Sequence, residues 1–177
     1  MHFSGTRLLS GLFCFSLAVC VANAAGPKAA HADLVDAKGA KVGSAKFTAS
    51  GSGVKMTVKV SGMTPGEHGI HIHNVGKCEA PDFKTAGGHL NPTNTHHGVN
   101  NTQDPKPHLG DMANLTVKSD GSGTASYTLN GVTLADGTNS LFHDGGTAVV
   151  IHAKADDLMS DPSGNSGDRV ACGVIGK

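Results

Sequence analysis

The sequence predicts an all-β domain of short strands, arranged as a sandwich or a closed barrel. Glycine is abundant, with 25 among 177 residues, and tryptophan is absent. Between the glycine-rich turns, apolar residues recur with the two-residue period of strands. No segment downstream of the N-terminal apolar stretch shows the 3.6-residue period of an amphipathic helix. Short strands must have their edges covered, and sandwiches and barrels do this.

Eight strands are expected, and each is bounded by turn-forming residues. The third shows the clearest alternation of apolar and polar positions, and a Ser-Asp-Gly-Ser-Gly segment at residues 119–123 predicts a hairpin between the fifth and sixth. The expected strands cover residues 31–35, 42–48, 54–60, 68–73, 115–118, 124–129, 147–153 and 170–175. No internal repeat or domain boundary interrupts them, so residues 25–177 form one domain.

Residues 1–24 have the organisation of a signal peptide. Arg7 precedes an apolar stretch over residues 8–21, and the small-x-small pattern of residues 22–24 is typical of a signal peptidase site. The stretch is shorter than the ~20 residues that a transmembrane helix needs. Val19 before Cys20 argues against a lipoprotein, because a small residue is expected there. We therefore expect export to the periplasm, a mature chain that begins at Ala25, and no membrane attachment.

The net charge argues against nucleic-acid binding, and the cysteine content predicts a disulfide. Cleavage removes Arg7 and no acidic residue, so 13 basic and 14 acidic residues remain, a net charge of −1. This balance provides no general field for nucleic acid. Only Cys78 and Cys172 remain, and two cysteines in an exported chain most simply form one disulfide. Closing a loop of about 95 residues would contribute roughly 4–5 kcal/mol to stability.

Two connections are long enough to be functional: the first long loop, residues 74–111, and the second long loop, residues 156–169. His71 and His73 stand two apart on an expected strand and project from one face. Further candidate ligands follow in the loops and at the end of a buried strand: His89, His97, His108, Asp111 and His152. Such residues suit copper or zinc. Six histidines and one aspartate exceed one tetrahedral site and supply two sites only if one ligand is shared.

These residues resemble the copper,zinc superoxide dismutase family, in its exported bacterial form. The resemblance covers essentially the whole chain after residue 31. It rests on the motifs at residues 69–73 (GIHIH), 88–92 (GHLNP), 108–111 (HLGD), 150–157 (VIHAKADD) and 169–176 (RVACGVIG). It implies an eight-stranded antiparallel Greek-key β-barrel, an immunoglobulin-like sandwich with two long functional loops.

The resemblance also implies a role for each motif residue. One copper per chain would be held by His71, His73, His89 and His152, and one zinc by His89, His97, His108 and Asp111. His89 would bridge the two ions. His97 is preferred to His96 because of its eight-residue distance from His89 and the glycine that follows. Asp156 would link His71 to His97, Arg169 would receive the substrate anion beside copper, and Cys78 would be bridged to Cys172. The remaining histidines are expected in packing or surface positions: His31, His68, His96 and His143.

The implied activity is conversion of two superoxide ions and two protons to dioxygen and hydrogen peroxide. Copper would be reduced and reoxidised in turn, with His89 carrying a proton. The second long loop contains no lysine up to Arg169, so Lys77 and Lys84 are candidates for steering the anion, whereas Asp168 would oppose it. Either a monomer or a homodimer is compatible with the sequence.

Three alternative functions fit the sequence less well. A non-enzymatic periplasmic copper-binding protein on the same barrel would tend to lose Arg169, the bridging His89 or the zinc ligands. A zinc hydrolase needs an open position on zinc, whereas four ligands are available here. A simple binding module gives no reason for seven convergent ligands.

Overall fold

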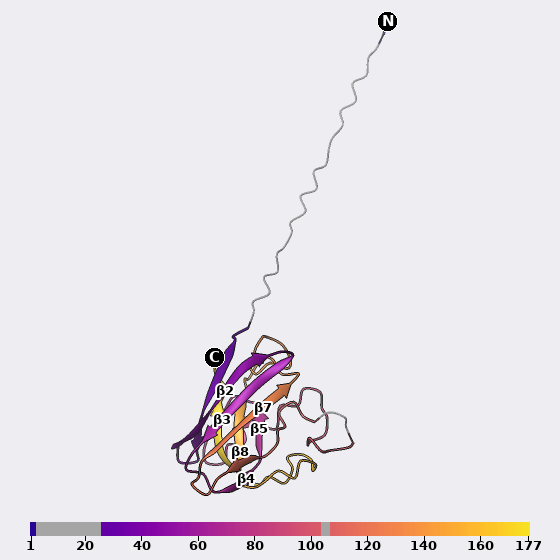
Figure 1. Cartoon of the computed structure of the whole chain (residues 1–177). Coiled ribbons are helices and arrows are strands. Elements are labelled where there is room, and N and C mark those ends of the chain that lie inside the picture. Colours follow the sequence, from indigo (N-terminus) through magenta and orange to yellow (C-terminus); the bar gives the residue numbers. More distant parts are fainter. Residues whose placement is uncertain (3–25, 104–106) are drawn as a thin grey trace.

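The computed structural model describes residues 1–2, 26–103 and 107–177, so the expected signal peptide lies outside the described residues except for Met1 and His2. The described part forms a single antiparallel sheet that curls into a nearly closed barrel (Figure 1). Its strands are β1 (Ala29–Asp36), β2 (Lys41–Ser50), β3 (Gly53–Val60), β4 (Gly66–His68), β5 (Ile70–His73), β6 (Leu115–Val117), β7 (Gly123–Asn130), β8 (Ala148–His152) and β9 (Arg169–Val174). The all-β barrel prediction is confirmed. Among the described residues, no helix is long and apolar enough to cross a membrane.

The strand count is nine rather than the expected eight, because the strand expected at residues 68–73 is divided at Gly69. β4 pairs with β6, whereas β5 pairs with β8. The sheet order is β4-β6-β7-β3-β2-β1-β9-β8-β5, so Gly69 joins its two ends. Gly69 N donates to Lys154 O at 2.8 Å, and a Cβ at position 69 would lie 2.8 Å from Ser166 Cβ. The change of partner closes the barrel and requires a residue without a side chain.

The barrel core is built from the inward-facing positions of the long strands. Leu34, Phe47 and Met56 are fully buried there, and the outward-facing residues that alternate with such positions along each strand are exposed or partly buried. β8 differs, because all five of its residues are buried. Val149 and Ile151 belong to the barrel core, whereas Ala148 and Val150 face a second cluster formed with the first long loop. The continuous apolar run in the sequence therefore reflects a strand covered on both faces.

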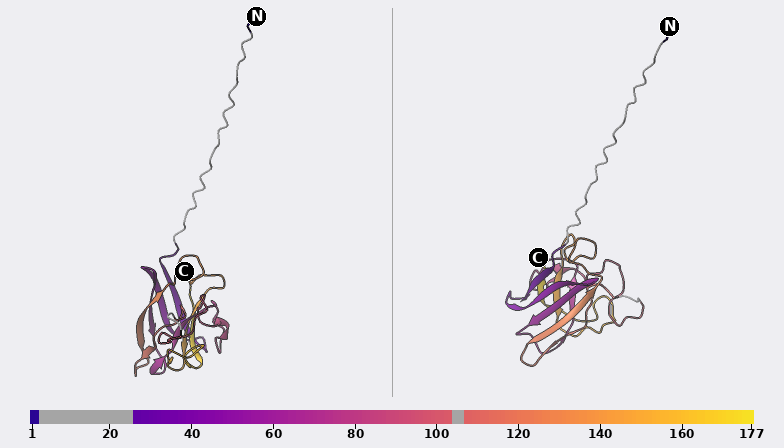
Figure 2. Two further views of the ribbon diagram at one scale, coloured as in Figure 1. Left: turned by 90° about the vertical axis from the view of Figure 1, so that its right-hand side faces the viewer. Right: turned by 45° about the horizontal axis from the view of Figure 1, so that its top comes forward.

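The first long loop covers the outer face of β5 and β8. Its described residues contain one short 3-10 helix, η1 (Lys84–Ala86), and lie on the side of the barrel away from β2 and β3 (Figure 2). The expected disulfide between Cys78 and Cys172 is confirmed, with the two Cα atoms 5.6 Å apart. It fastens the loop to β9. The long loops and the outer face of β5 and β8 together enclose the buried histidines His71, His73, His97, His108 and His152.

Candidate metal centre

The strand pairing of β5 with β8 sets the position of the first three histidines. Ile70 and Ile72 of β5 point into the barrel core, so His71 and His73 point outward beneath the loops. His152 stands at the end of β8, next to an irregularity in the pairing with β9. All three side chains are buried.

His89 from the first long loop completes a group of four. One ligand atom from each of the four histidines lies within 4.8 Å of the other three. The outer ring nitrogens are occupied: His71 Nε2 donates to Asp156 Oδ2 at 2.7 Å, His73 Nδ1 to Gly87 O at 2.9 Å, and His152 Nδ1 to Gly167 O at 3.1 Å. The other ring nitrogen of each of these three, and Nε2 of His89, are buried and have no hydrogen-bond partner in the described part of the chain: His71 Nδ1, His73 Nε2, His89 Nε2 and His152 Nε2. We call these residues the four-histidine group.

Burial keeps the imidazoles of the four-histidine group neutral, which is the protonation state that binds a metal. Burial lowers the pKa of His71 to about 3 and that of His152 to about 4. It also lowers the pKa of His73 and of His89. Neutral imidazoles that each fix one nitrogen by donation present the other nitrogen's lone pair to a metal. The group fits copper, for which imidazole is a suitable ligand.

A second group surrounds the carboxylate of Asp111. Its Oδ1 lies 2.8 Å from His89 Nδ1, 3.0 Å from His97 Nδ1 and 3.3 Å from His108 Nδ1. Ligand atoms of a tetrahedral zinc site lie about 3.3 Å apart, given zinc–ligand bonds near 2.0 Å. The other oxygen, Oδ2, accepts from the backbone N–H groups of Gly98 and His108. We call His89, His97, His108 and Asp111 the Asp111 group.

The ionisation of Asp111 and the direction of the hydrogen bond from His71 show which residues belong to the Asp111 group. Burial acts to raise the pKa of Asp111, but hydrogen bonds from the three histidines outweigh it and lower the pKa below its usual range. By proximity alone, the fourth member would be His71 and not His108, because ligand atoms of His71, His89, His97 and Asp111 all lie within 4.8 Å of one another. However, its Nε2 is directed to Asp156 at 2.7 Å. The carboxylate and three imidazoles fit zinc.

His89 faces both groups through its two ring nitrogens. Nδ1 is directed to Asp111, and Nε2 is one of the four unpartnered nitrogens. Its ring is stacked on His71, with 3.9 Å between centroids. The two groups therefore share one imidazole, as two sites built from seven ligands require.

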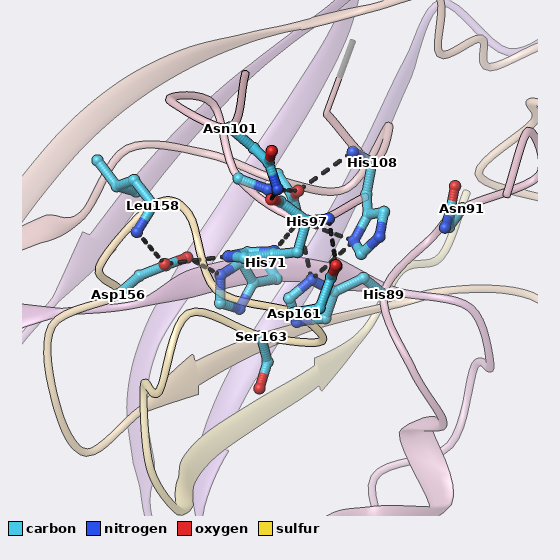
Figure 3. Close-up of polar contacts among 12 residues, drawn as sticks. His71, His89, Asn91, His97, Asn101, His108, Asp156, Leu158, Asp161 and Ser163 are labelled. Carbon is cyan, nitrogen blue, oxygen red and sulfur yellow. Dashed lines mark hydrogen bonds and ion pairs between the residues drawn. The ribbon is translucent and has the colours of Figure 1, made fainter. Parts of the chain in front are cut away.

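Asp156 joins the two groups from the outside (Figure 3). Its Oδ2 accepts from His71 Nε2, whereas its Oδ1 accepts from His97 Nε2 at 3.0 Å and from Leu158 N at 2.6 Å. Burial acts to lower the pKa of His97, but hydrogen bonds to Asp111 and Asp156 outweigh it and raise the pKa to about 9. This carboxylate fixes the orientation of one imidazole from each group.

Arg169 lies at the start of β9, beside the four-histidine group. Its guanidinium donates to Phe83 O at 2.8 Å and to Gly87 O at 2.7 Å. Gly87 O also accepts from His73, so the arginine and this histidine share one anchor. The disulfide holds this part of the loop against the strand that carries Arg169.

The four histidines that were expected in packing or surface positions lie outside the two groups. His96 is exposed and pairs with Asp161, while its buried neighbour His97 enters the Asp111 group. The nitrogens of His68 face the carbonyl oxygens of His152 and Thr64. His31 is exposed and His143 is partly buried.

The proposed steering residues are all exposed. Lys84 forms an ion pair with Asp82 at 2.9 Å, which reduces the positive charge it can offer an anion. Lys77 and Asp168 have no ion pair among the described residues.

Two supporting residues were not found from the sequence. Asn114 clamps the backbone of Asp156 with two hydrogen bonds, of 2.9 and 2.8 Å. Asp161 accepts from His97 N at 2.7 Å and so ties the second long loop to the first. Each stands more than 40 residues from its partner, and no spacing motif marks either one.

Comparison with known proteins finds a matching family model and relatives that are similar in sequence over most of the chain. The family model for copper/zinc superoxide dismutase matches residues 41–175. Superoxide dismutase [Cu-Zn] 1 of Aquifex aeolicus is 46% identical over 147 residues, which are 82% of this chain and 86% of the relative. Superoxide dismutase [Cu-Zn] 2 of the same organism is 42% identical over 171 residues, covering 96% of this chain and 99% of the relative.

Solved structures are similar in fold as well as in sequence. A superoxide dismutase-like protein from Bacillus subtilis, in the form of a double mutant, superposes with a TM-score of 0.77 at 37% identity. The match covers 81% of this chain and 95% of that chain. The clock protein EA4 superposes with a TM-score of 0.70 at 32% identity, covering 85% of this chain and 95% of the other.

Proposed function

Because the chain belongs to the copper/zinc superoxide dismutase family, we propose that the four-histidine group holds one copper and the Asp111 group one zinc. The reaction is the dismutation of superoxide: two superoxide ions and two protons give dioxygen and hydrogen peroxide. The observation that carries the assignment is the set of four buried, unpartnered nitrogens, each on a ring whose other nitrogen is already engaged, in a group whose ligand atoms lie within 4.8 Å of one another.

The residues around the copper position have three different roles: binding the anion, holding a proton and orienting the imidazoles. Copper, when bound, supplies the redox chemistry by alternating between its two oxidation states. Arg169 directs its guanidinium, held by two backbone carbonyls, at the place where a small anion would approach. His89 holds a proton at Nε2 when that nitrogen is free, while its Nδ1 stays fixed in the Asp111 group. Asp156 and the Gly87 carbonyl keep the imidazoles oriented.

A non-enzymatic copper-binding role is the alternative, and the complete set of residues argues against it. Carrying copper does not require Arg169 at the copper position, a shared imidazole, or a second group that fits zinc. All three features are present here.

Metal counting combined with an activity assay tests this assignment. We expect one copper and one zinc per fully loaded chain, and consumption of superoxide in a pulse-radiolysis assay. Asp111→Ala should lose most of its zinc while copper falls less, because Asp111 contacts three ligands of one group and only His89 of the other. The control is Asp120→Ala, in the exposed turn before β7. Only one metal per loaded chain, or an inactive protein with both metals, would contradict the proposal.

We also propose that residues 1–24 direct export to the periplasm and are then removed. The support is the signal-like sequence and a disulfide that an oxidising compartment favours. The periplasmic protein should begin at Ala25 by mass spectrometry. Alkylation without reduction should add no mass, because Cys14 and Cys20 leave with the signal and the other two cysteines are bridged. Retention of residue 1, or two reactive thiols in the folded protein, would be inconsistent with this scheme.

A further inference from the structure

A cationic groove lies on the wall of the barrel opposite the metal centre. It has a volume of about 530 Å³ and runs over the outer face of β2 and β3. Three lysines and three hydroxyl residues line it, and no carboxylate does: Ser44, Lys46, Thr48, Lys55, Thr57 and Lys59. β2 and β3 occupy the middle of the sheet order, whereas β5, which carries His71 and His73, is at its end.

The strand register arranges the lysines in a regular pattern. Lys46 stands opposite Thr57, so that Lys55 and Lys59 are its two diagonal neighbours on β3. Diagonal neighbours across antiparallel strands are about 7–8 Å apart. Each lysine is directly opposite a hydroxyl residue rather than another lysine. Three ammonium groups can therefore reach one elongated ligand, with a hydroxyl donor beside each.

These charges are not neutralised within the protein. Lys46, Lys55 and Lys59 are exposed, and none of them forms an ion pair in the described part of the chain. The nearest carboxylate across the register is Asp33, opposite Ser44, and it is paired with Lys41 at 2.8 Å. The mature chain has a net charge of −1, so this positive charge is a local feature.

Two common reasons for lysines on strands do not apply here. Lysines often protect an exposed sheet edge from pairing with another chain. β2 and β3 are each hydrogen-bonded on both sides, so they have no edge to protect. Insertion into a bilayer needs apolar side chains near the cationic ones, and the exposed large apolar residues of the described part lie elsewhere: Met1, Val99, Met159 and Val174.

We propose that this groove binds a short segment of a linear polyanion that carries phosphate groups. Phosphate groups spaced along a flexible chain match ammonium groups several ångströms apart and accept from the hydroxyls between them. Because the groove is on the wall opposite the metal centre, a bound polymer leaves the copper side open to superoxide. The groove thus serves as a tether for the active enzyme.

Binding of polyphosphate to the metal-loaded protein tests the proposal. We expect measurable binding by calorimetry at low ionic strength, and an affinity that falls with salt with a log–log slope of about −2, as for three ammonium–phosphate contacts. The variant Lys46→Gln/Lys55→Gln/Lys59→Gln should bind at least tenfold more weakly and keep full dismutase activity. The matched control is Lys38→Gln/Lys118→Gln/Lys154→Gln, which changes the net charge equally and should bind as the wild type does.

Four outcomes would overturn the proposal. The first is no binding of polyphosphate by the wild type, and the second is an equal loss of binding in both triple variants, which would reduce the effect to net charge. The third is binding to phosphatidylglycerol vesicles but not to polyphosphate, which would identify a membrane surface instead. The fourth is loss of dismutase activity in the groove variant, which would contradict the independence of the two sites.

Discussion

Replacing Arg169 by glutamate is expected to lower the rate of superoxide consumption about ten- to a hundredfold, because local electrostatic focusing raises the association rate of a charged substrate by roughly 10- to 1000-fold. The substitution puts a carboxylate where the guanidinium is held by Phe83 O and Gly87 O. Arg169 is the only arginine of residues 25–177, whose 13 basic and 14 acidic residues provide no net positive charge to compensate. Arg169 donates no hydrogen bond to a metal-ligand side chain, so copper and zinc contents should stay at the wild-type level. The measurement is pulse radiolysis with metal analysis.

Two comparisons make this result specific to position 169. Lys38→Glu, in the exposed turn between β1 and β2, makes the same change in net charge and should leave the rate nearly unchanged. The wild-type rate should fall as ionic strength rises, and the Arg169→Glu rate should not, because screening then weakens a repulsion. Undiminished activity in a fully metallated Arg169→Glu protein would remove Arg169 from the mechanism.

Introducing a methyl group at Gly164 is expected to weaken zinc binding about ten- to a hundredfold, as loss of an outer partner of metal ligands commonly does. A Cβ at this position would overlap Asp156 Oδ1 and lie 2.9 Å from His97 Nε2. The backbone cannot easily withdraw, because Gly164 N donates to Ser160 O at 2.7 Å and Gly164 O accepts from Asp157 N at 2.8 Å. The Asp156 carboxylate must then leave its hydrogen bonds with His71 and His97. Zinc affinity is measured by competition with a chelator.

The control for backbone strain is Gly167→Ala. Both glycines have a positive φ, +61° at Gly164 and +78° at Gly167, so both substitutions carry a conformational cost. A Cβ at Gly167 meets only the flexible side chain of Lys154, and zinc affinity should change little. In an Asp156→Ala background the Gly164→Ala substitution should have almost no further effect, because the displaced carboxylate is already absent. An equal loss in both backgrounds would show that Gly164 does not act through Asp156.

Local patterns in the sequence were sufficient for the strands and for the types of ligand. The alternation at residues 54–60 indicates a strand with one face buried. The continuous apolar run before His152 indicates a strand with both faces buried. The spacing of His71 and His73 places both on one face of β5, because successive side chains of a strand alternate. The count of two cysteines downstream of the expected signal peptide predicted the disulfide between Cys78 and Cys172, and the family motifs imply the same pairing. These features depend on neighbouring residues or on whole motifs, which a sequence displays directly.

Contacts between distant segments were decided only by the tertiary structure. The division of one expected strand at Gly69 follows from a change of hydrogen-bond partner, which depends on where β6 and β8 lie. Asn114 and Asp161 act on residues more than 40 positions away, and Gly164 matters because folding brings Asp156 against its Cα. Of the adjacent residues His96 and His97, the loop turns His97 inward to Asp111 and His96 outward to Asp161. Such features arise from the packing of segments, and packing is a property of the folded chain rather than of any local run of residues.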